Sequence, residues 1–342
     1  MNQYLVHFSL VIAISLLLSA CEKPSAEVNL YSARKEVLIR PLLEQFTQDT
    51  GITVNVISSK ADALLKRIES EGINSPADVL LTTDAGRLFR AKSAGVFTPI
   101  ASDVIESNVP KQYRDSENYW TGLSVRVRPI MVTEEGKKFN LSRYEDLSNP
   151  ELSGQICIRS SSNIYNQSLV SSLLAASPTE EVETWAKGLV GNMARSPQGG
   201  DRDQIRAAAA GQCSIVVANT YYLASMISNE DKSDDFSAGS AMTVIWPNQV
   251  EGRGAHVNIS GAGVVKSAPN KDNAVKLIEF LSSDKAQEIY ANVNFEYPVK
   301  ADIPLHPVLQ KWGEFNADPL NVDYLGEKNA DAVKLMDRAG WK

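Results

Sequence analysis

Strands and helices alternate most clearly in residues 28–81, which read VNLYSARKEVLIRPLLEQFTQDTGITVNVISSKADALLKRIESEGINSPADVLL. Short runs typical of strands occupy residues 28–31, residues 52–56, where apolar residues alternate with polar ones, and residues 78–81. Between these runs, apolar residues recur at the three- and four-residue spacing of amphipathic helices, and Gly51 and Gly72 follow as stop signals. This βαβαβ order predicts a parallel sheet with right-handed crossovers.

The same alternation continues through the rest of the chain. Further strands are predicted at residues 125–132, 155–159, 213–218 and 259–265, and further helices at 185–190, 204–210 and 274–289. In the predicted strand 125–132, Arg126 and Arg128 share one face, because strand residues two apart point the same way. The length of 342 residues favours two α/β domains, each with its own core.

The overall charge argues against a nucleic-acid-binding function. The chain has 34 Lys+Arg and 41 Asp+Glu, a net charge of −7, whereas a nucleic-acid binder needs a basic face. The hydrophobic content of 43% is that of an ordinary globular protein. Only three histidines are present, so a zinc site built on several of them is excluded.

The N-terminus is predicted to be a targeting segment. Residues 10–18 form an apolar run that is too short to span a membrane, which is typical of a signal peptide over residues 1–20. The run ends in Leu-Ser-Ala-Cys, which resembles the lipobox of bacterial lipoproteins and predicts lipidation of Cys21. The alternative is ordinary cleavage that leaves Cys21 as an incidental thiol. Both interpretations place the mature protein outside the cytoplasm, and the first anchors it to a bacterial membrane through lipid alone.

Two cysteines remain, Cys157 and Cys213. An even pair in an oxidising compartment is a disulfide candidate, and both residues lie in or beside predicted neighbouring strands. Two buried free thiols are the alternative.

Common catalytic motifs do not occur in the sequence. G-x-S-x-G, H-E-x-x-H and G-x-x-x-x-G-K-[ST] are all missing, so an enzyme is not predicted. Tyrosines stand out instead, since Tyr165, Tyr221 and Tyr222 lie where predicted strands lead into helices. Ligands of α/β sheets bind beyond the carboxyl ends of strands. The alternative is that these rings pack and their hydroxyls find ordinary partners.

Several motifs together resemble the ferric-iron-binding periplasmic proteins of ABC importers. They are Asn-Leu-Tyr-Ser-Ala-Arg at 29–34, Lys-Ala-Asp-Ala-Leu-Leu at 60–65, Ser-Pro-Ala-Asp at 75–78, the run at 159–168, Asn-Thr-Tyr-Tyr at 219–222 and Ser-Gly-Ala-Gly-Val-Val at 260–265. The resemblance implies a two-lobed type II periplasmic-binding-protein fold. It also implies capture of Fe(III) and its delivery to an inner-membrane permease with its ATPase.

The resemblance implies a ligand set of Tyr165, Tyr221 and Tyr222. Fe(III) is a hard cation that prefers anionic oxygen, and three phenolates balance its charge. Related proteins complete the coordination with carbonate or a similar synergistic anion, which needs a facing cation. Arg126 and Arg128 are candidates for that role, because a guanidinium matches a planar oxyanion. The resemblance favours Arg126, with Arg34 as a second, and a surface charge or an interlobe salt bridge is the alternative for each. Some members carry His or Tyr where this chain has Lys35 and Glu36, so a first-lobe ligand of that type is missing.

The expected lobes comprise residues 28–125 plus 249–298, and 126–248 plus 299–342, with two interlobe crossovers between them. A monomer is expected, and closure of the cleft on the ligand. A rival on the same scaffold binds an oxyanion or small organic acid through Arg126, with the tyrosines only packing. An extracytoplasmic hydrolase is a third class, but it needs a nucleophile and a base that the sequence does not offer.

Overall fold

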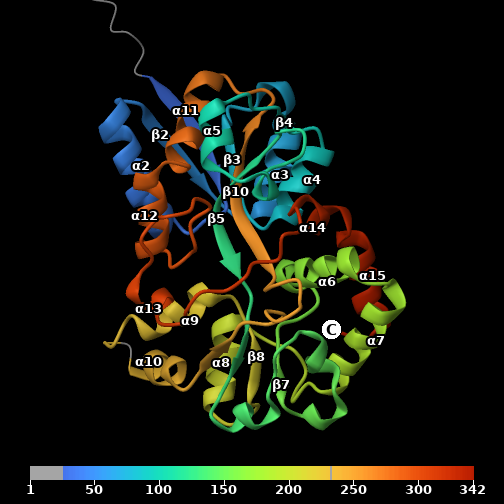
Figure 1. Cartoon of the computed structure of the whole chain (residues 1–342). Coiled ribbons are helices and arrows are strands. Elements are labelled where there is room, and N and C mark those ends of the chain that lie inside the picture. The colour runs from blue at the N-terminus through green and yellow to red at the C-terminus, as the bar shows by residue number, and fades with distance from the viewer. Residues whose placement is uncertain (1–25, 232) are drawn as a thin grey trace, which may run out of the picture.

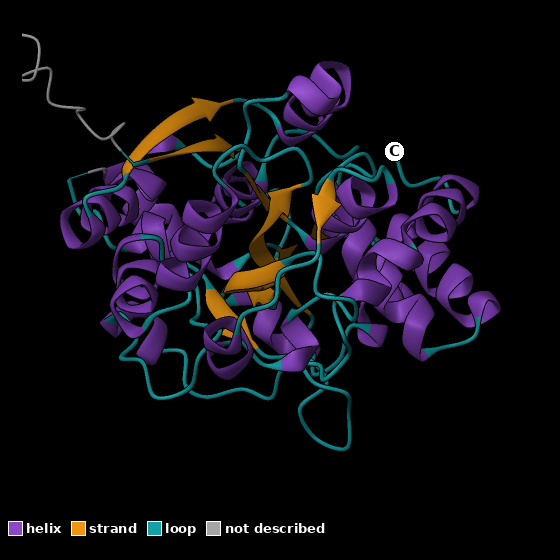
Figure 2. Ribbon diagram, turned by 90° about the horizontal axis from the view of Figure 1, so that it is seen from above, coloured by secondary structure: helices purple, strands orange, loops and turns teal. Residues whose placement is uncertain are grey.

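The computed structural model describes residues 26–231 and 233–342. The predicted signal peptide and the candidate lipidation site Cys21 lie outside these residues. Two lobes, each built around its own sheet, lie one above the other in Figure 1. From above, helices flank the strands on both sides (Figure 2). No helix of the described part is both long and apolar enough to cross a bilayer.

The first lobe contains a mixed six-stranded sheet. Its strands are β1 (Glu27–Ser32), β2 (Thr53–Ser58), β3 (Val79–Thr83), β4 (Phe97–Thr98), β5 (Thr121–Val127) and β10 (Val257–Val265). β1 pairs in parallel with β2 and β3, as the βαβαβ pattern predicts. β10 runs antiparallel to β3, β4 and β5. The α-helices in these parts of the chain are α2 (Glu36–Thr50), α3 (Ala61–Glu71), α4 (Ala85–Ser93), α5 (Asp103–Asn108), α11 (Lys271–Leu281) and α12 (Asp284–Val293).

The second lobe contains a four-stranded sheet in the order β7-β8-β6-β9. Its strands are β6 (Ile130–Val132), β7 (Ile156–Cys157), β8 (Ile215–Val217) and β9 (Thr243–Ile245). Its helices are α6 (Ile164–Ala176), α7 (Thr179–Gly191), α8 (Asp201–Ala209), α9 (Thr220–Ile227) and α10 (Ser233–Ser240). A disulfide joins Cys157 in β7 to Cys213 just before β8, with Cα atoms 6.0 Å apart.

Short 3-10 helices occur in both lobes. They span Gly72–Asn74, Lys111–Tyr113, Glu135–Phe139, Glu145–Ser148 and Pro150–Leu152.

The chain passes between the sheets twice, from β5 to β6 and from β9 to β10. β5 runs from the upper sheet toward the lower lobe, and β10 runs back from the lower lobe into the upper sheet (Figure 1). The single strand predicted over 125–132 is wrong, because β5 ends at Val127 and β6 begins at Ile130 in the other sheet. The chain turns there because Pro129 has no N–H for a ladder, while the Arg128 N–H donates to the His256 carbonyl. Arg126 consequently lies in a first-lobe strand and not in the second lobe.

Two further departures concern helices. The helix predicted over 274–289 is two helices, α11 and α12, because the Ser283 hydroxyl caps the second by accepting from Ala286 N. The C-terminal helices are α13 (Pro307–Gln310), α14 (Asp323–Glu327) and α15 (Asn329–Arg338). Leu309 packs in the first-lobe core and Leu335 in the second. The segment expected wholly in the second lobe is therefore divided between the two cores.

Candidate metal centre

A cleft of about 680 Å³ receives side chains from both sheets. Arg34, Thr83, Arg126 and Glu296 line it from the first-lobe side, and Arg159, Tyr165, Tyr221 and Tyr222 line it from the second. The three tyrosines singled out in the sequence therefore share one cleft with both arginines singled out for the anion.

Helix starts position the tyrosines. Tyr165 lies in the first turn of α6, where the Asn163 side chain accepts from the Tyr165 N–H at 3.1 Å. Tyr221 and Tyr222 lie in the first turn of α9, directly after β8. Their ring centroids are 4.3 Å apart, and all three tyrosines are half-buried. The strand ends thus bring three phenolic side chains to one wall of the cleft.

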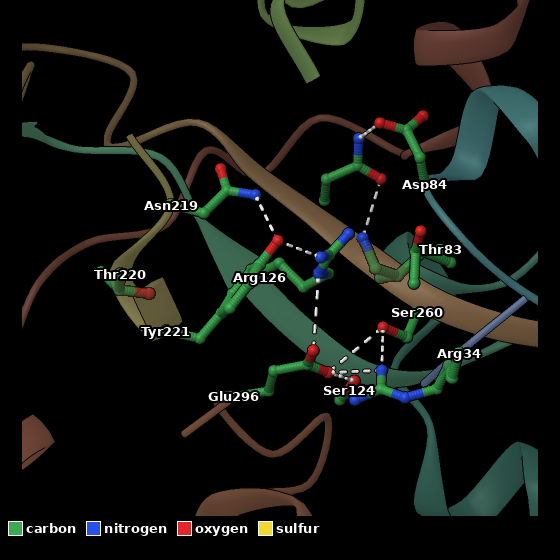
Figure 3. A network of polar contacts seen from close by, with 12 residues as sticks. Arg34, Thr83, Asp84, Ser124, Arg126, Asn219, Thr220, Tyr221, Ser260 and Glu296 are labelled. Carbon is green, nitrogen blue, oxygen red and sulfur yellow. Dashed lines mark hydrogen bonds and ion pairs between the residues drawn. The ribbon is translucent and has the colours of Figure 1, made fainter. Parts of the chain in front are cut away.

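Arg126 connects the tyrosines from the opposite sheet. Its Nη2 donates to Tyr165 Oη at 3.3 Å and also to Tyr221 Oη. Its guanidinium carbon lies 4.8 Å from the Tyr165 ring centroid and 4.5 Å from that of Tyr221. Two of the candidate iron ligands therefore converge on one cation in this conformation. Figure 3 shows Tyr221 and Arg126 facing each other at the centre of this network.

Glu296 lies on the other side of Arg126, and the sequence analysis did not identify it as a site residue. Its Oε1 is 3.6 Å from Arg126 Nε, and its Oε2 is 3.0 Å from Arg34 Nη1 (Figure 3). Oε2 also accepts from the hydroxyls of Ser124 and Ser260. The two arginines therefore share one buried carboxylate, which reduces their mutual repulsion.

The three tyrosines of the cleft have different pKa values because their surroundings differ. Burial raises the pKa of Tyr165, but the Arg126 guanidinium and a hydrogen bond with Tyr221 together lower the pKa to about 8, below the usual 10.0. Burial raises the pKa of Tyr221 well above its usual value. Burial, together with the charges of Tyr165 and Asp201, raises the pKa of Tyr222 to about 12. Tyr165 is thus the most acidic of the three phenols in the metal-free protein.

Arg128 has a different environment from Arg126. Its Nη1 lies 2.9 Å from Asp201 Oδ2, and its Nη2 donates to the Asn166 side chain at 2.8 Å. Arg128 is 1% exposed, and both of its Nη atoms bond to second-lobe groups, so it braces the starts of α6 and α8. The preference for Arg126 over Arg128 at the cleft agrees with this arrangement.

The donor set fits a hard cation. Among the described residues, no cluster of three His, Cys, Asp or Glu side chains is arranged to hold a metal ion. The phenolic oxygens of Tyr165, Tyr221 and Tyr222 are the hard donors that gather in the cleft. Anionic oxygen suits trivalent iron better than it suits softer metals.

Comparison with known proteins defines the family. A family model described as "Bacterial extracellular solute-binding protein" matches residues 74–321, more than half of the chain. The chain belongs to this family. It is accordingly a solute-binding protein and not an enzyme, and its family acts outside the cytoplasm.

Similar proteins carry names that refer to iron. "Iron uptake protein A1" of Synechocystis is 47% identical over 346 residues, covering 98% of this chain and 96% of that protein. A Trichodesmium protein solved in complex with iron and citrate ligands is 48% identical, with a TM-score of 0.90, covering 93% of this chain and 100% of that one. The apo ferric ion-binding protein A of Pasteurella haemolytica is 40% identical, with a TM-score of 0.85, covering 92% and 98%. These matches confirm the two-lobed α/β fold and the predicted relationship to ferric-iron-binding proteins.

Proposed function

We propose that this solute-binding protein captures Fe(III) with Tyr165, Tyr221 and Tyr222 and with a synergistic anion such as carbonate, for an ABC importer. The convergence of Tyr165 Oη and Tyr221 Oη on the Arg126 guanidinium, beside Tyr222 in one cleft, carries the proposal. The names of the similar proteins support the same cargo.

The chemistry of the cleft explains how iron is held. Each tyrosine phenol that binds Fe(III) loses its proton and becomes a phenolate, because a bound cation is the strongest local charge. Three phenolates balance the 3+ charge, and a bidentate anion fills positions that they leave open. We assign the anion to the side of the site that holds Arg126 and Arg34, since a guanidinium matches a planar oxyanion.

Iron loading of the purified mature protein tests this function. Tyrosinate–Fe(III) charge transfer absorbs visible light, so the loaded protein is expected to be reddish and to carry one iron per chain by metal analysis. The rival function, an oxyanion or small organic acid bound directly by Arg126, predicts a colourless protein without stoichiometric iron. A colourless sample after exposure to ferric citrate, with correct folding, would refute the iron proposal.

The proposal also includes the delivery of iron and the location of the protein. The protein is expected to pass iron to an inner-membrane permease and its ATPase, as a monomer held at the membrane by a lipid on Cys21. Stable attachment requires more than one acyl chain, which lipoprotein processing of a cysteine supplies.

The anchor gives a separate prediction. The mature protein is expected to partition into detergent and to begin at an acylated Cys21 by mass spectrometry. Cys21→Ala is expected to release the protein or to leave it as a precursor. An unmodified mature N-terminus at another residue would instead support ordinary cleavage and a soluble binding protein.

A further inference from the structure

One side of α6, the helix that carries Tyr165, bonds to groups outside the second lobe. Tyr165, Ser168 and Ser172 are three and four residues apart, so their side chains form one row along the helix. Ser168 is 0% exposed and Ser172 is 1% exposed. The partners of this row lie in β5, at the end of β3 and between β9 and β10; in the same order they are Arg126, Asp84 and Arg253. The row therefore attaches α6 to the first lobe and to a crossover.

Asp84 is the partner that is buried most deeply. It is 0% exposed, and its carboxylate accepts from uncharged donors. The Ser168 hydroxyl lies 2.8 Å from Oδ1 and 2.9 Å from Oδ2, the Asn258 amide donates to Oδ2 at 2.8 Å, and the Gly86 N–H donates to Oδ1 at 2.9 Å. A buried carboxylate is costly unless such donors are in place. Ser168 is the donor that comes from the other lobe.

The backbone of Asp84 is held in an unusual conformation. Its φ is +85°, in a region that residues with a side chain avoid. The Asn258 side chain secures this turn, because its Oδ1 accepts from the Ala85 N–H at 2.8 Å while its Nδ2 donates to Asp84. Strain of this kind persists where the surroundings impose it, and it is concentrated at functional sites. Asp84 also caps α4, but that role accounts only for its bond to the Gly86 N–H.

A neighbouring serine shows that burial in α6 does not by itself provide a partner for a hydroxyl. Ser171 is 0% exposed, yet its Oγ has no hydrogen-bond partner within the described part of the chain. Ser168, three residues earlier, lies within hydrogen-bond distance of both carboxylate oxygens of Asp84. The contact between Ser168 and Asp84 is therefore a specific feature of this face of the helix.

We infer that Asp84 is a positioning residue for iron binding, which fixes Tyr165 through Ser168. Ser168 lies three residues after Tyr165, close to one helical turn, so a bond that holds Ser168 also fixes the helix start from which the phenol reaches the cleft. Neither Asp84 nor Ser168 is among the residues that line the cleft. The inference rests on the proposed function and adds two residues that act without touching the metal.

The two contacts that hold Tyr165 differ in what iron does to them. Arg126 donates to the phenol oxygen itself at 3.3 Å, and this contact changes when that oxygen binds iron. The bond between Asp84 and Ser168 does not involve the phenol, so it persists in the loaded protein. A ligand that is held in place before binding loses less freedom on binding, which raises the affinity. Asp84 thus contributes to iron affinity by fixing α6.

Ser168→Ala in the full mature protein removes the hydroxyl that bonds to Asp84 and introduces a good helix former. The variant is expected to bind Fe(III) about tenfold more weakly than the parent under citrate competition, the scale of one hydrogen bond to a charged group. Its tyrosinate–Fe(III) band is expected to shift in wavelength, because the band depends on the geometry of the iron–oxygen bonds. Ser171→Ala is the matched control from the same helix and is expected to keep the affinity and the band of the parent.

The outcomes separate this inference from the proposed function. A parent protein that never develops the band refutes the iron function, and the inference with it. A coloured parent, together with a Ser168→Ala protein whose band and affinity equal those of the parent, overturns the inference alone. Equal losses in Ser168→Ala and Ser171→Ala, with equally lowered melting temperatures of the iron-free proteins, also overturn it, because they indicate a general effect on helix packing.

Discussion

Tyr221→Phe and Tyr222→Phe are each expected to lose ferric iron to citrate at neutral pH under conditions in which the parent keeps it. Each substitution removes one oxygen and leaves nearly all of the ring packing in place, including the 4.3 Å contact between the two rings. The remaining phenolates no longer balance the 3+ charge, so the loss is expected to be severe. The measurement is the retained iron and the visible band after dialysis against citrate.

Tyr144→Phe provides a matched control. The Tyr144 hydroxyl is buried outside the cleft, where it donates to the Arg128 carbonyl at 2.7 Å and accepts from His256 N at 3.0 Å. Its loss is expected to lower the free energy of unfolding by about 1 kcal/mol or more and to leave iron retention unchanged. Full iron retention in both the Tyr221 and Tyr222 variants would remove these residues from the ligand set, whatever the fold.

Arg126→Met is expected to remove the most acidic tyrosine titration of the iron-free protein. The Arg126 guanidinium lowers the pKa of Tyr165 through its charge and through a hydrogen bond, so its removal leaves only the Tyr221 hydrogen bond against the effect of burial. The pKa is then expected to rise to 10 or above, where an ordinary tyrosine titrates. The measurement is a pH titration of tyrosinate absorbance, with Tyr165→Phe to identify the step that disappears.

Iron binding is expected to weaken as the pH falls, and Tyr165 is again the group responsible. Below a pH of about 8 Tyr165 is protonated in the iron-free protein, so protons compete with iron more strongly as the pH falls. Arg34→Met is the control, because Arg34 is paired with Glu296 and makes no hydrogen bond to the tyrosines among the described contacts. If the step near 8 persists in Arg126→Met, the electrostatic account of Tyr165 is wrong.

Much of the fold could be predicted because local patterns decide it. The periodicity of residues 28–81 predicted parallel strands, and β1 does pair in parallel with β2 and β3. The chain length and the continued strand–helix alternation predicted two α/β lobes. The same local logic placed Tyr165 and the Tyr221–Tyr222 pair at the starts of α6 and α9. Strand ends and helix starts are readable from neighbouring residues, so tyrosines at these positions could be singled out.

Features that depend on distant contacts could not be predicted. The apolar residues of 125–132 fit one strand equally well, and only the sheet pairings assign β5 and β6 to different lobes. Glu296 lies just after α12 without any periodic signal. It reaches the cleft because the next residue, Tyr297, bridges back to Val125 of β5. The position of this carboxylate in the site therefore depends on the sheet topology and not on its neighbours in the sequence.

The most direct test of the central claim is an anomalous difference map recorded at the iron absorption edge from crystals of the iron-loaded mature protein. The account predicts one strong peak in the interlobe cleft, within bonding distance of the Oη atoms of Tyr165, Tyr221 and Tyr222. A strong peak elsewhere, or one in the cleft that none of these three oxygens reaches, would contradict it.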